Sequence, residues 1–174
     1  MLKLYTFVCV LVGVAALAQP PRMELEPNGF APVQVTIPSI PNEKLVEITK
    51  AWAAEYNKYG QRNNRGFDAT DVTNNTITIS AFKKNAFYYR DRGEAFEHKI
   101  NYSMKIVFSQ NSYSVTFTVN KIFTDSDVEL EYNIPNYFTS AGKLKEGYLE
   151  LDTSLETTVN DIVNSHYNFI VNYK

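Results

Sequence analysis

Apolar and polar residues alternate over two neighbouring stretches in the middle of the chain. The apolar side chains of the first stretch are Tyr102, Met104, Ile106 and Phe108, and those of the second are Tyr113, Val115, Phe117 and Val119. A period of two residues is that of a β-strand with one buried face. The polar run Gln110-Asn111-Ser112 between the stretches favours a turn. The pattern therefore predicts a long hairpin, ending near Phe123, with one apolar and one wetter face.

Three further segments have the composition of strands: Phe30–Ile37, Phe67–Val72 and Thr76–Phe82. The first alternates apolar and polar residues and stops at Pro38, which lacks the backbone donor that a strand needs. The other two flank Asn74-Asn75, and asparagine tolerates the positive φ of a tight hairpin turn. Residues 128–132 have the alternation of a short edge strand.

Two segments carry the apolar spacing of amphipathic helices. The first places Leu45, Ile48, Trp52, Tyr56 and Tyr59 at steps of three and four residues. Asn42 is its predicted N-cap and Gly60 its predicted C-cap. The second helix is expected to open on a capping box from Thr153 to Glu156. Its apolar stripe is formed by Leu155, Val159, Ile162, Val163, His166 and Ile170.

These elements follow the order β-α-β-β-β-β-α. Five strands joined by hairpins predict one curved antiparallel sheet, and two helices with single apolar stripes need a sheet face to cover. We therefore expect an α+β two-layer sandwich of about five strands and two helices. The residues 83–97 and 124–151 show no clear period and are interpreted as long connections.

The first 18 residues have the composition of a secretory signal peptide. Lys3 precedes an apolar run from Leu4 to Leu17, and Ala16-Leu17-Ala18 matches the small residues of a cleavage site. We expect residues 1–18 to be removed, 19–29 to form a disordered leader, and 30–174 to form one domain. The protein is then exported to the periplasm or beyond without a transmembrane span. Cys9 lacks the preceding residues of a lipoprotein site, so lipidation is not expected.

The composition argues against several classes of function. The 19 Asp and Glu residues outnumber the 17 Lys and Arg residues, whereas nucleic-acid binding needs clustered basic residues. Cys9, the single cysteine, would leave with the signal, and no cofactor or metal motif is present. Neither His98 nor His166 has a local catalytic partner. His166 is expected to pack in the core, and His98 to be a solvated strand residue.

Acidic residues provide two weaker candidates. Asp125, Asp127 and Glu129 alternate as in a calcium loop, but Leu130 and Asn136 stand where such a loop needs glycine and a final acid. A solvated acidic turn is the favoured interpretation. Glu94 and Glu97 form a possible carboxylate pair of a hydrolase, although such pairs arise by chance among exposed acids. We assign no catalytic residue.

The element order, the Pro41–Leu45–Trp52 helix, the Asn74-Asn75 turn and the Tyr102–Phe123 hairpin resemble a family of exported bacterial proteins. This family is known as a domain of unknown function with a TATA-binding-protein-like (TBP-like) fold. The resemblance covers about Val33 to Phe123, and the final helix matches in type and order. It implies the fold but no catalytic residues. It does not imply DNA binding, because fold alone does not carry function.

Two aromatic segments are candidates for binding a partner or a ligand. The first contains Phe87, Tyr88, Tyr89, Arg90 and Arg92, and the second Tyr132, Tyr137 and Phe138. Tyrosine and arginine are enriched at interface hot spots. The favoured interpretation is structural: the aromatic rings fold back to cover the sheet end, and the arginines pair with Asp91 and Glu94. If the two segments meet at one end of the sheet, they form an aromatic cleft.

Three functions remain open on the sequence. The leading hypothesis is a non-catalytic exported module that binds an envelope protein or a glycan. The alternative is a carrier of a small apolar ligand between sheet and helices, suggested by the high aromatic content. A hydrolase directed at cell wall or glycan is the third. The partner, the ligand and the oligomeric state are not set by the sequence.

Overall fold

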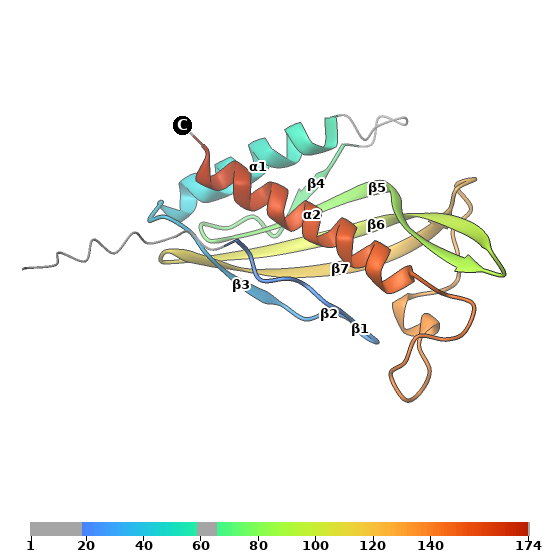
Figure 1. The fold of residues 1–174 in the computed structure, drawn as a ribbon. Helices are drawn as coiled ribbons and strands as arrows, with labels where there is room; N and C mark the ends of the chain where they lie inside the picture. Colours follow the sequence, from blue (N-terminus) through green and yellow to red (C-terminus); the bar gives the residue numbers. More distant parts are fainter. Residues whose placement is uncertain (1–18, 59–65, 174) are drawn as a thin grey trace, which may run out of the picture.

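A five-stranded antiparallel sheet forms the body of the protein (Figure 1). The computed structural model describes residues 19–58 and 66–173, so the predicted signal peptide, Tyr59 and Gly60 lie outside the described residues. The strand order is β3-β7-β6-β5-β4. The bounds are β3 Val33–Thr36, β4 Asp68–Thr70, β5 Thr76–Asp91, β6 Glu94–Ser109 and β7 Ser112–Thr124. The predicted hairpin of β6 and β7 is confirmed, and its register pairs Phe108 with Tyr113.

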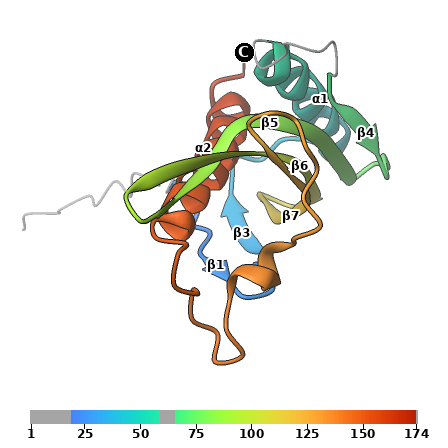
Figure 2. The same ribbon diagram turned by 90° about the vertical axis from the view of Figure 1, so that its right-hand side faces the viewer.

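Two helices, α1 (Asn42–Lys58) and α2 (Leu151–Val171), cover one face of the curved sheet (Figures 1 and 2). The alternating apolar residues of β6 and β7, except the half-buried Val119, are buried beneath them, together with Trp52 of α1 and Ile162 of α2. His166 links the layers, because its Nε2 lies 2.9 Å from Thr49 Oγ1 of α1 and its Nδ1 lies 3.3 Å from the Tyr113 hydroxyl of β7. The predicted two-layer α+β architecture is therefore confirmed.

The interpretation of residues 83–97 as a connection is wrong. Strands β5 and β6 continue through this segment and pair as far as Asp91 and Glu94. The register shifts between Lys83 and Phe87, where Asn85 has a φ of 47°. This bulge interrupts the period of two, which is why the sequence shows no strand pattern there. The result is a hairpin that extends beyond the helices at one end of the molecule (Figure 1).

The predicted helix starts are also shifted. Helix α1 includes Asn42 itself, and its first backbone bond runs from the amide of Leu45 to the carbonyl of Pro41. Helix α2 begins at Leu151, two residues before the predicted N-cap Thr153, and Glu150 precedes it in a left-handed conformation. Glu156 therefore does not reach back to Thr153. Its carboxylate binds the N-terminal segment instead.

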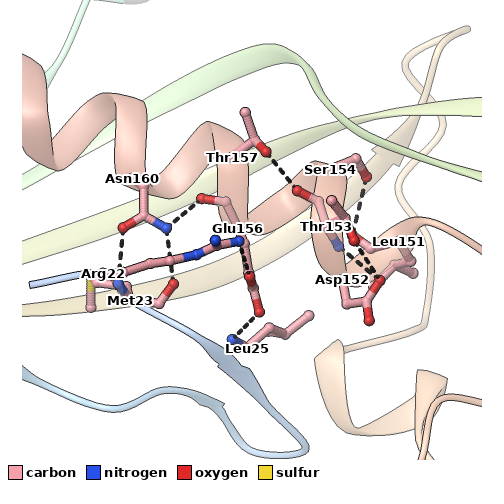
Figure 3. Close-up of polar contacts among 10 residues, drawn as sticks. All are labelled: Arg22, Met23, Leu25, Leu151, Asp152, Thr153, Ser154, Glu156, Thr157 and Asn160. Carbon is pink, nitrogen blue, oxygen red and sulfur yellow. Dashed lines mark hydrogen bonds and ion pairs between the residues drawn. The ribbon is translucent and has the colours of Figure 1, made fainter.

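Residues 19–29 are not a disordered leader. They include β1 (Leu25–Glu26), which pairs with β2 (Gly29–Phe30), and the side chain of Met23 is buried. The Asn160 side chain accepts a hydrogen bond from the Met23 amide and donates one to the Met23 carbonyl, both at 2.9 Å (Figure 3). Glu156 accepts bonds from the Leu25 amide and from Arg22. The buried Met23 side chain and these side-chain hydrogen bonds order the segment. Neither leaves a periodic pattern in the sequence.

Candidate functional site

The two aromatic segments meet at the end of the β5–β6 hairpin. The loop from residue 125 to residue 150 returns beneath the hairpin and carries the short 3-10 helix η1 (Ile134–Tyr137) (Figure 2). The ring centroids of Phe87 and Tyr137 are 6.2 Å apart, and the ring of Tyr148 lies 4.9 Å from those of both Tyr89 and Tyr137. The two segments therefore meet at one end of the sheet, a point that the sequence left open.

His98 belongs to this aromatic cluster, which comprises Phe87, Tyr89, Phe96, His98, Tyr137 and Tyr148. The prediction that His98 is solvated is wrong, because its ring stacks on Phe87 at 4.8 Å and on Tyr89 at 5.1 Å. Its Nδ1 donates a hydrogen bond to the carbonyl of Phe96 at 2.9 Å. Burial lowers the pKa of His98 below its ordinary value. The imidazole ring is therefore neutral at pH 7 and packs between Phe87 and Tyr89 as an aromatic ring.

Backbone and polar contacts join the hairpin to the start of α2. The amide of Arg90 donates to the carbonyl of Leu149 at 2.9 Å. The Ser154 hydroxyl accepts a bond from the Tyr88 amide and donates one to the Tyr88 carbonyl. The expected pairing of Arg90 with Asp91 or Glu94 is not observed, since its guanidinium pairs with Glu150 at 3.2 Å. These contacts hold the end of the β5–β6 hairpin, called the tip below, against the start of α2.

Large apolar side chains are exposed around this tip. The exposed fractions are 36% for Tyr88, 40% for Phe96, 54% for Tyr132 and 65% for Leu149. Arg90 lies over the ring of Tyr88, with its guanidinium carbon 5.8 Å from the ring centroid. We call these five residues the tip patch. They do not form one continuous surface: Tyr88 and Arg90 project from one face of the hairpin, and Phe96, which pairs with Tyr89, projects from the opposite face. Large apolar side chains exposed in one region are typical of interaction sites.

The structure divides the predicted binding residues into two groups. Phe87 and Tyr137 are buried, and Tyr89 and Phe138 are partly buried, so these four mainly build the tip. Tyr88, Arg90, Arg92 and Tyr132 are exposed and can contact a partner. Phe96, Tyr148, Leu149 and Glu150 also lie at this end of the molecule and were not predicted from the sequence. The position of Phe96 on a strand could have been inferred from its spacing of two residues from Glu94. Leu149 and Glu150 contact Arg90 across a long stretch of chain, and such contacts leave no local pattern in the sequence.

A lysine occupies the acidic turn that resembles a calcium loop. The Lys99 ammonium pairs with Asp127 at 3.0 Å and with Asp125 at 3.6 Å, and it also donates to the Asp125 carbonyl. Hydrogen bonding to Asp127 raises the pKa of Lys99. The ammonium balances the negative charges of Asp125 and Asp127 in this turn. Within residues 19–58 and 66–173, no group of three or more His, Cys, Asp or Glu side chains has the arrangement of a metal site.

The remaining candidates of catalytic type have structural surroundings. His166 is fully buried, and burial lowers its pKa to about 3. Its predicted packing role is confirmed by its bonds to Thr49 and Tyr113. Glu94 and Glu97 are both exposed on β6 and sit three positions apart. Side chains at that separation point to opposite faces of a strand, so the two carboxylates do not face each other.

The architecture defines the protein as an α+β domain with a TBP-like fold. A scan against protein-family models and a search of curated proteins both gave no match. Among solved structures, the chain is similar to a TBP-like protein from Parabacteroides distasonis, with a TM-score of 0.57 and 15% identity over 83% of this chain and 93% of that one. It is also similar to a DUF4468 family protein from Bacteroides ovatus, with a TM-score of 0.55 and 11% identity. That alignment covers 86% of this chain and 87% of the other.

These similarities confirm the expected resemblance, to a domain-of-unknown-function family with a TBP-like fold, at the level of the fold. Identities of 11% and 15% carry no site residue from one chain to the other. None of the described helices has the length and apolar character needed to span a membrane.

Proposed function

We propose that the protein is an exported, non-catalytic binding module of the bacterial cell envelope and that it binds through the tip patch. The observation that carries this proposal is the exposure of Tyr88, Phe96, Tyr132 and Leu149 at one end of the molecule, on both faces of the hairpin. Leaving such side chains in water has a free-energy cost of roughly 25 cal/mol per Å² of apolar surface, which a partner would relieve.

The rigidity of the tip supports a role in recognition. The aromatic cluster packs behind the patch, and the Arg90–Leu149 and Tyr88–Ser154 bonds hold its backbone. A surface that is already ordered loses little conformational entropy when it binds. Arg90 adds a directional donor, and its pairing with Glu150 at 47% exposure leaves it accessible. A partner with apolar and acceptor groups fits this surface.

Export is the second component of the proposal. It rests on the composition of residues 1–18, with Lys3, a long apolar run and Ala16-Leu17-Ala18. The test is mass spectrometry of the protein purified from an envelope fraction of its native cells. We expect a mature chain that begins at Gln19. An intact chain that begins at Met1 in the cytoplasmic fraction would contradict export.

Binding is tested by co-sedimentation of the purified domain with envelope material. We expect the wild-type domain to sediment with the envelope and the double variant Phe96→Ser/Leu149→Ser to stay in the supernatant. Val72→Ser is the matched control, because Val72 is 43% exposed and lies near the opposite end of β5. Equal sedimentation of all three proteins, or none for the wild type, would overturn the proposal.

The carrier hypothesis lacks a supporting observation in the described part of the chain. Trp52, Phe108 and Phe117 are all buried, and the ring of Phe117 stacks on Tyr102 at 4.9 Å. A surface depression of about 730 Å³ lies along α2, but it is open to solvent, and five of its seven lining residues are polar. Its residues are Asp161, Asn164, Ser165, Asn168, Phe169, Asn172 and Tyr173. An apolar ligand prefers a predominantly hydrophobic lining.

A further inference from the structure

Residues 19–21 form a short arm ahead of the folded part of the chain. Gln19 and Pro21 are exposed and Pro20 is half-buried. None of these residues makes a hydrogen bond or an ion pair with another residue in the described part of the chain. Proline fixes its own φ and favours the extended polyproline conformation, so Pro20-Pro21 is a stiff spacer between Gln19 and the domain.

The arm ends where the N-terminal segment docks on α2 (Figure 3). The Arg22 guanidinium pairs with Glu156 at 2.8 Å. The amide and the carbonyl of Met23 both bond the Asn160 side chain at 2.9 Å, and the Met23 side chain is 1% exposed. The domain therefore holds the chain from residue 22 onward, and no contact among the described residues restrains the side chain of Gln19.

A glutamine at a free N-terminus carries its own electrophile. Its α-nitrogen and its side-chain Cδ can close a five-membered ring, the lactam pyroglutamate. Near neutral pH, part of an ordinary α-amine is unprotonated and nucleophilic. The expected cleavage after Ala18 makes Gln19 the first residue of the mature chain. Because the Gln19 carboxamide is exposed and has no partner among the described residues, nothing there holds it away from the amine.

We propose that the exported chain is modified at Gln19, which cyclises to pyroglutamate. The α-nitrogen attacks Cδ, a new C–N bond forms within the residue, and the carboxamide C–N bond breaks to release ammonia. The proton that the amine loses leaves with the ammonia, so the reaction needs no oxidant, reductant or second reactant. The inference rests on the proposed export and adds the chemical state of the mature N-terminus.

The same amine has a competing target in the carbonyl carbon of Pro20. Attack there forms a six-membered diketopiperazine and releases residues 19–20, so that the chain then begins at Pro21. This ring needs a cis bond between Gln19 and Pro20, and peptide bonds before proline are mostly trans. The lactam needs no isomerisation and is therefore the expected product.

Cyclisation changes both the charge and the protease resistance of the arm. The lactam nitrogen is an amide nitrogen, so the mature N-terminus loses its positive charge. Aminopeptidases bind a free α-amine and therefore do not act on a lactam. The arm that leads to the Arg22 and Met23 contacts is thereby protected from trimming.

The test is tandem mass spectrometry of the protein purified from the envelope fraction of its native cells. Free amines are dimethylated before digestion after Glu24 or Glu26, which prevents cyclisation during later handling. We expect an N-terminal peptide that begins at Gln19, is lighter by one ammonia and carries no label on its first residue. The matched control is Gln19→Asn, which keeps a carboxamide but can close only a strained four-membered ring. It should give a peptide of full mass with a labelled N-terminus.

The outcomes separate this inference from the proposed export. A cyclised wild type together with a labelled Gln19→Asn variant supports the modification. A wild-type chain that begins at Gln19 with full mass and a labelled amine, or a processed chain that begins at Pro21 or at another residue, would overturn it and leave export standing. Equal loss of ammonia in both proteins would also overturn it. An intact chain that begins at Met1 in the cytoplasmic fraction would overturn export and the modification together.

Discussion

The amide of Arg90 donates a hydrogen bond to the carbonyl of Leu149 at 2.9 Å, and this bond joins two segments that are 59 positions apart in the chain. It brings the end of β5 against the residues that lead into α2. The tip patch therefore contains side chains from the hairpin and from the loop. Its shape depends on the loop remaining docked, so contacts that hold the loop also hold the proposed binding surface.

The docking of the N-terminal segment on α2 leads to a first prediction. Asn160→Ala removes both bonds to the Met23 backbone and leaves partly buried polar groups without partners. We expect the free energy of unfolding to fall by about 1–3 kcal/mol. Urea denaturation measures the change. Asn164→Ala is the control on the same helix, with an expected change in the free energy of unfolding within about 0.5 kcal/mol. An equally small effect of Asn160→Ala would contradict a stabilising role of the Asn160–Met23 hydrogen bonds.

The contact between the two helices gives a second prediction. Trp52 is buried, stacks on Tyr56 at 5.4 Å and donates from its indole nitrogen to Ser165 of α2. Trp52→Ala should lower the free energy of unfolding by about 3–5 kcal/mol, because it leaves a cavity at the helix–sheet interface. Ser165→Ala loses only one hydrogen bond and should cost about 1 kcal/mol. Similar urea midpoints for the two variants would contradict this packing.

The buried histidine predicts an acid-sensitive fold. The pKa of His166 is about 3 in the folded protein and about 6.5 in an unfolded chain. Below pH 6.5 the unfolded chain binds a proton that the folded protein excludes, so stability falls as the pH falls. The expected loss from this group between pH 7 and pH 5 is about 2 kcal/mol.

Urea unfolding of the wild type and of His166→Gln at pH 7 and pH 5 isolates this contribution, since the carboxylates are common to both proteins. The difference in stability between the two pH values should be smaller in the variant by about 2 kcal/mol. His98, whose pKa is also lowered by burial, changes stability in the same direction in both proteins. Identical pH dependence of wild type and variant would refute the assignment.

Two buried tyrosine hydroxyls, those of Tyr102 and Tyr137, have no hydrogen-bond partner among the described residues and provide a fourth prediction. Removing a buried hydroxyl that has no partner relieves its desolvation cost, so Tyr102→Phe and Tyr137→Phe should each leave the free energy of unfolding unchanged or raise it by up to about 1 kcal/mol. Thermal unfolding measures the effect. A loss of more than about 1 kcal/mol in either variant would show that its hydroxyl has a partner in solution.

The sequence predicts the parts of this fold whose causes are local. The alternation from Tyr102 to Phe123 and the helical spacing from Leu45 to Trp52 depend only on which face is buried, and both are confirmed. The hairpin end was missed because the bulge near Asn85 breaks the alternation. The order of residues 19–29 was not predicted, because a single buried side chain, Met23, produces no repeating apolar pattern. Both errors concern irregular backbone.

The candidate site shows the same limit. Its aromatic and arginine residues could be singled out, since their composition is unusual for a connection. Their division into buried supports such as Phe87 and exposed contacts such as Tyr88 depends on alternation in a strand that the sequence does not reveal. The aromatic cluster depends on Tyr137 and Tyr148 meeting across a loop, and no local pattern encodes that contact.

Site-specific photo-cross-linking in native cells tests the binding surface most directly. A photoreactive phenylalanine analogue replaces Tyr88 in the tip patch in one protein and Val72 near the opposite end of β5 in another. We expect a discrete cross-linked envelope species from position 88 and none from position 72. Cross-links from position 72 alone, or the same species from both positions, would contradict a binding surface at the hairpin tip.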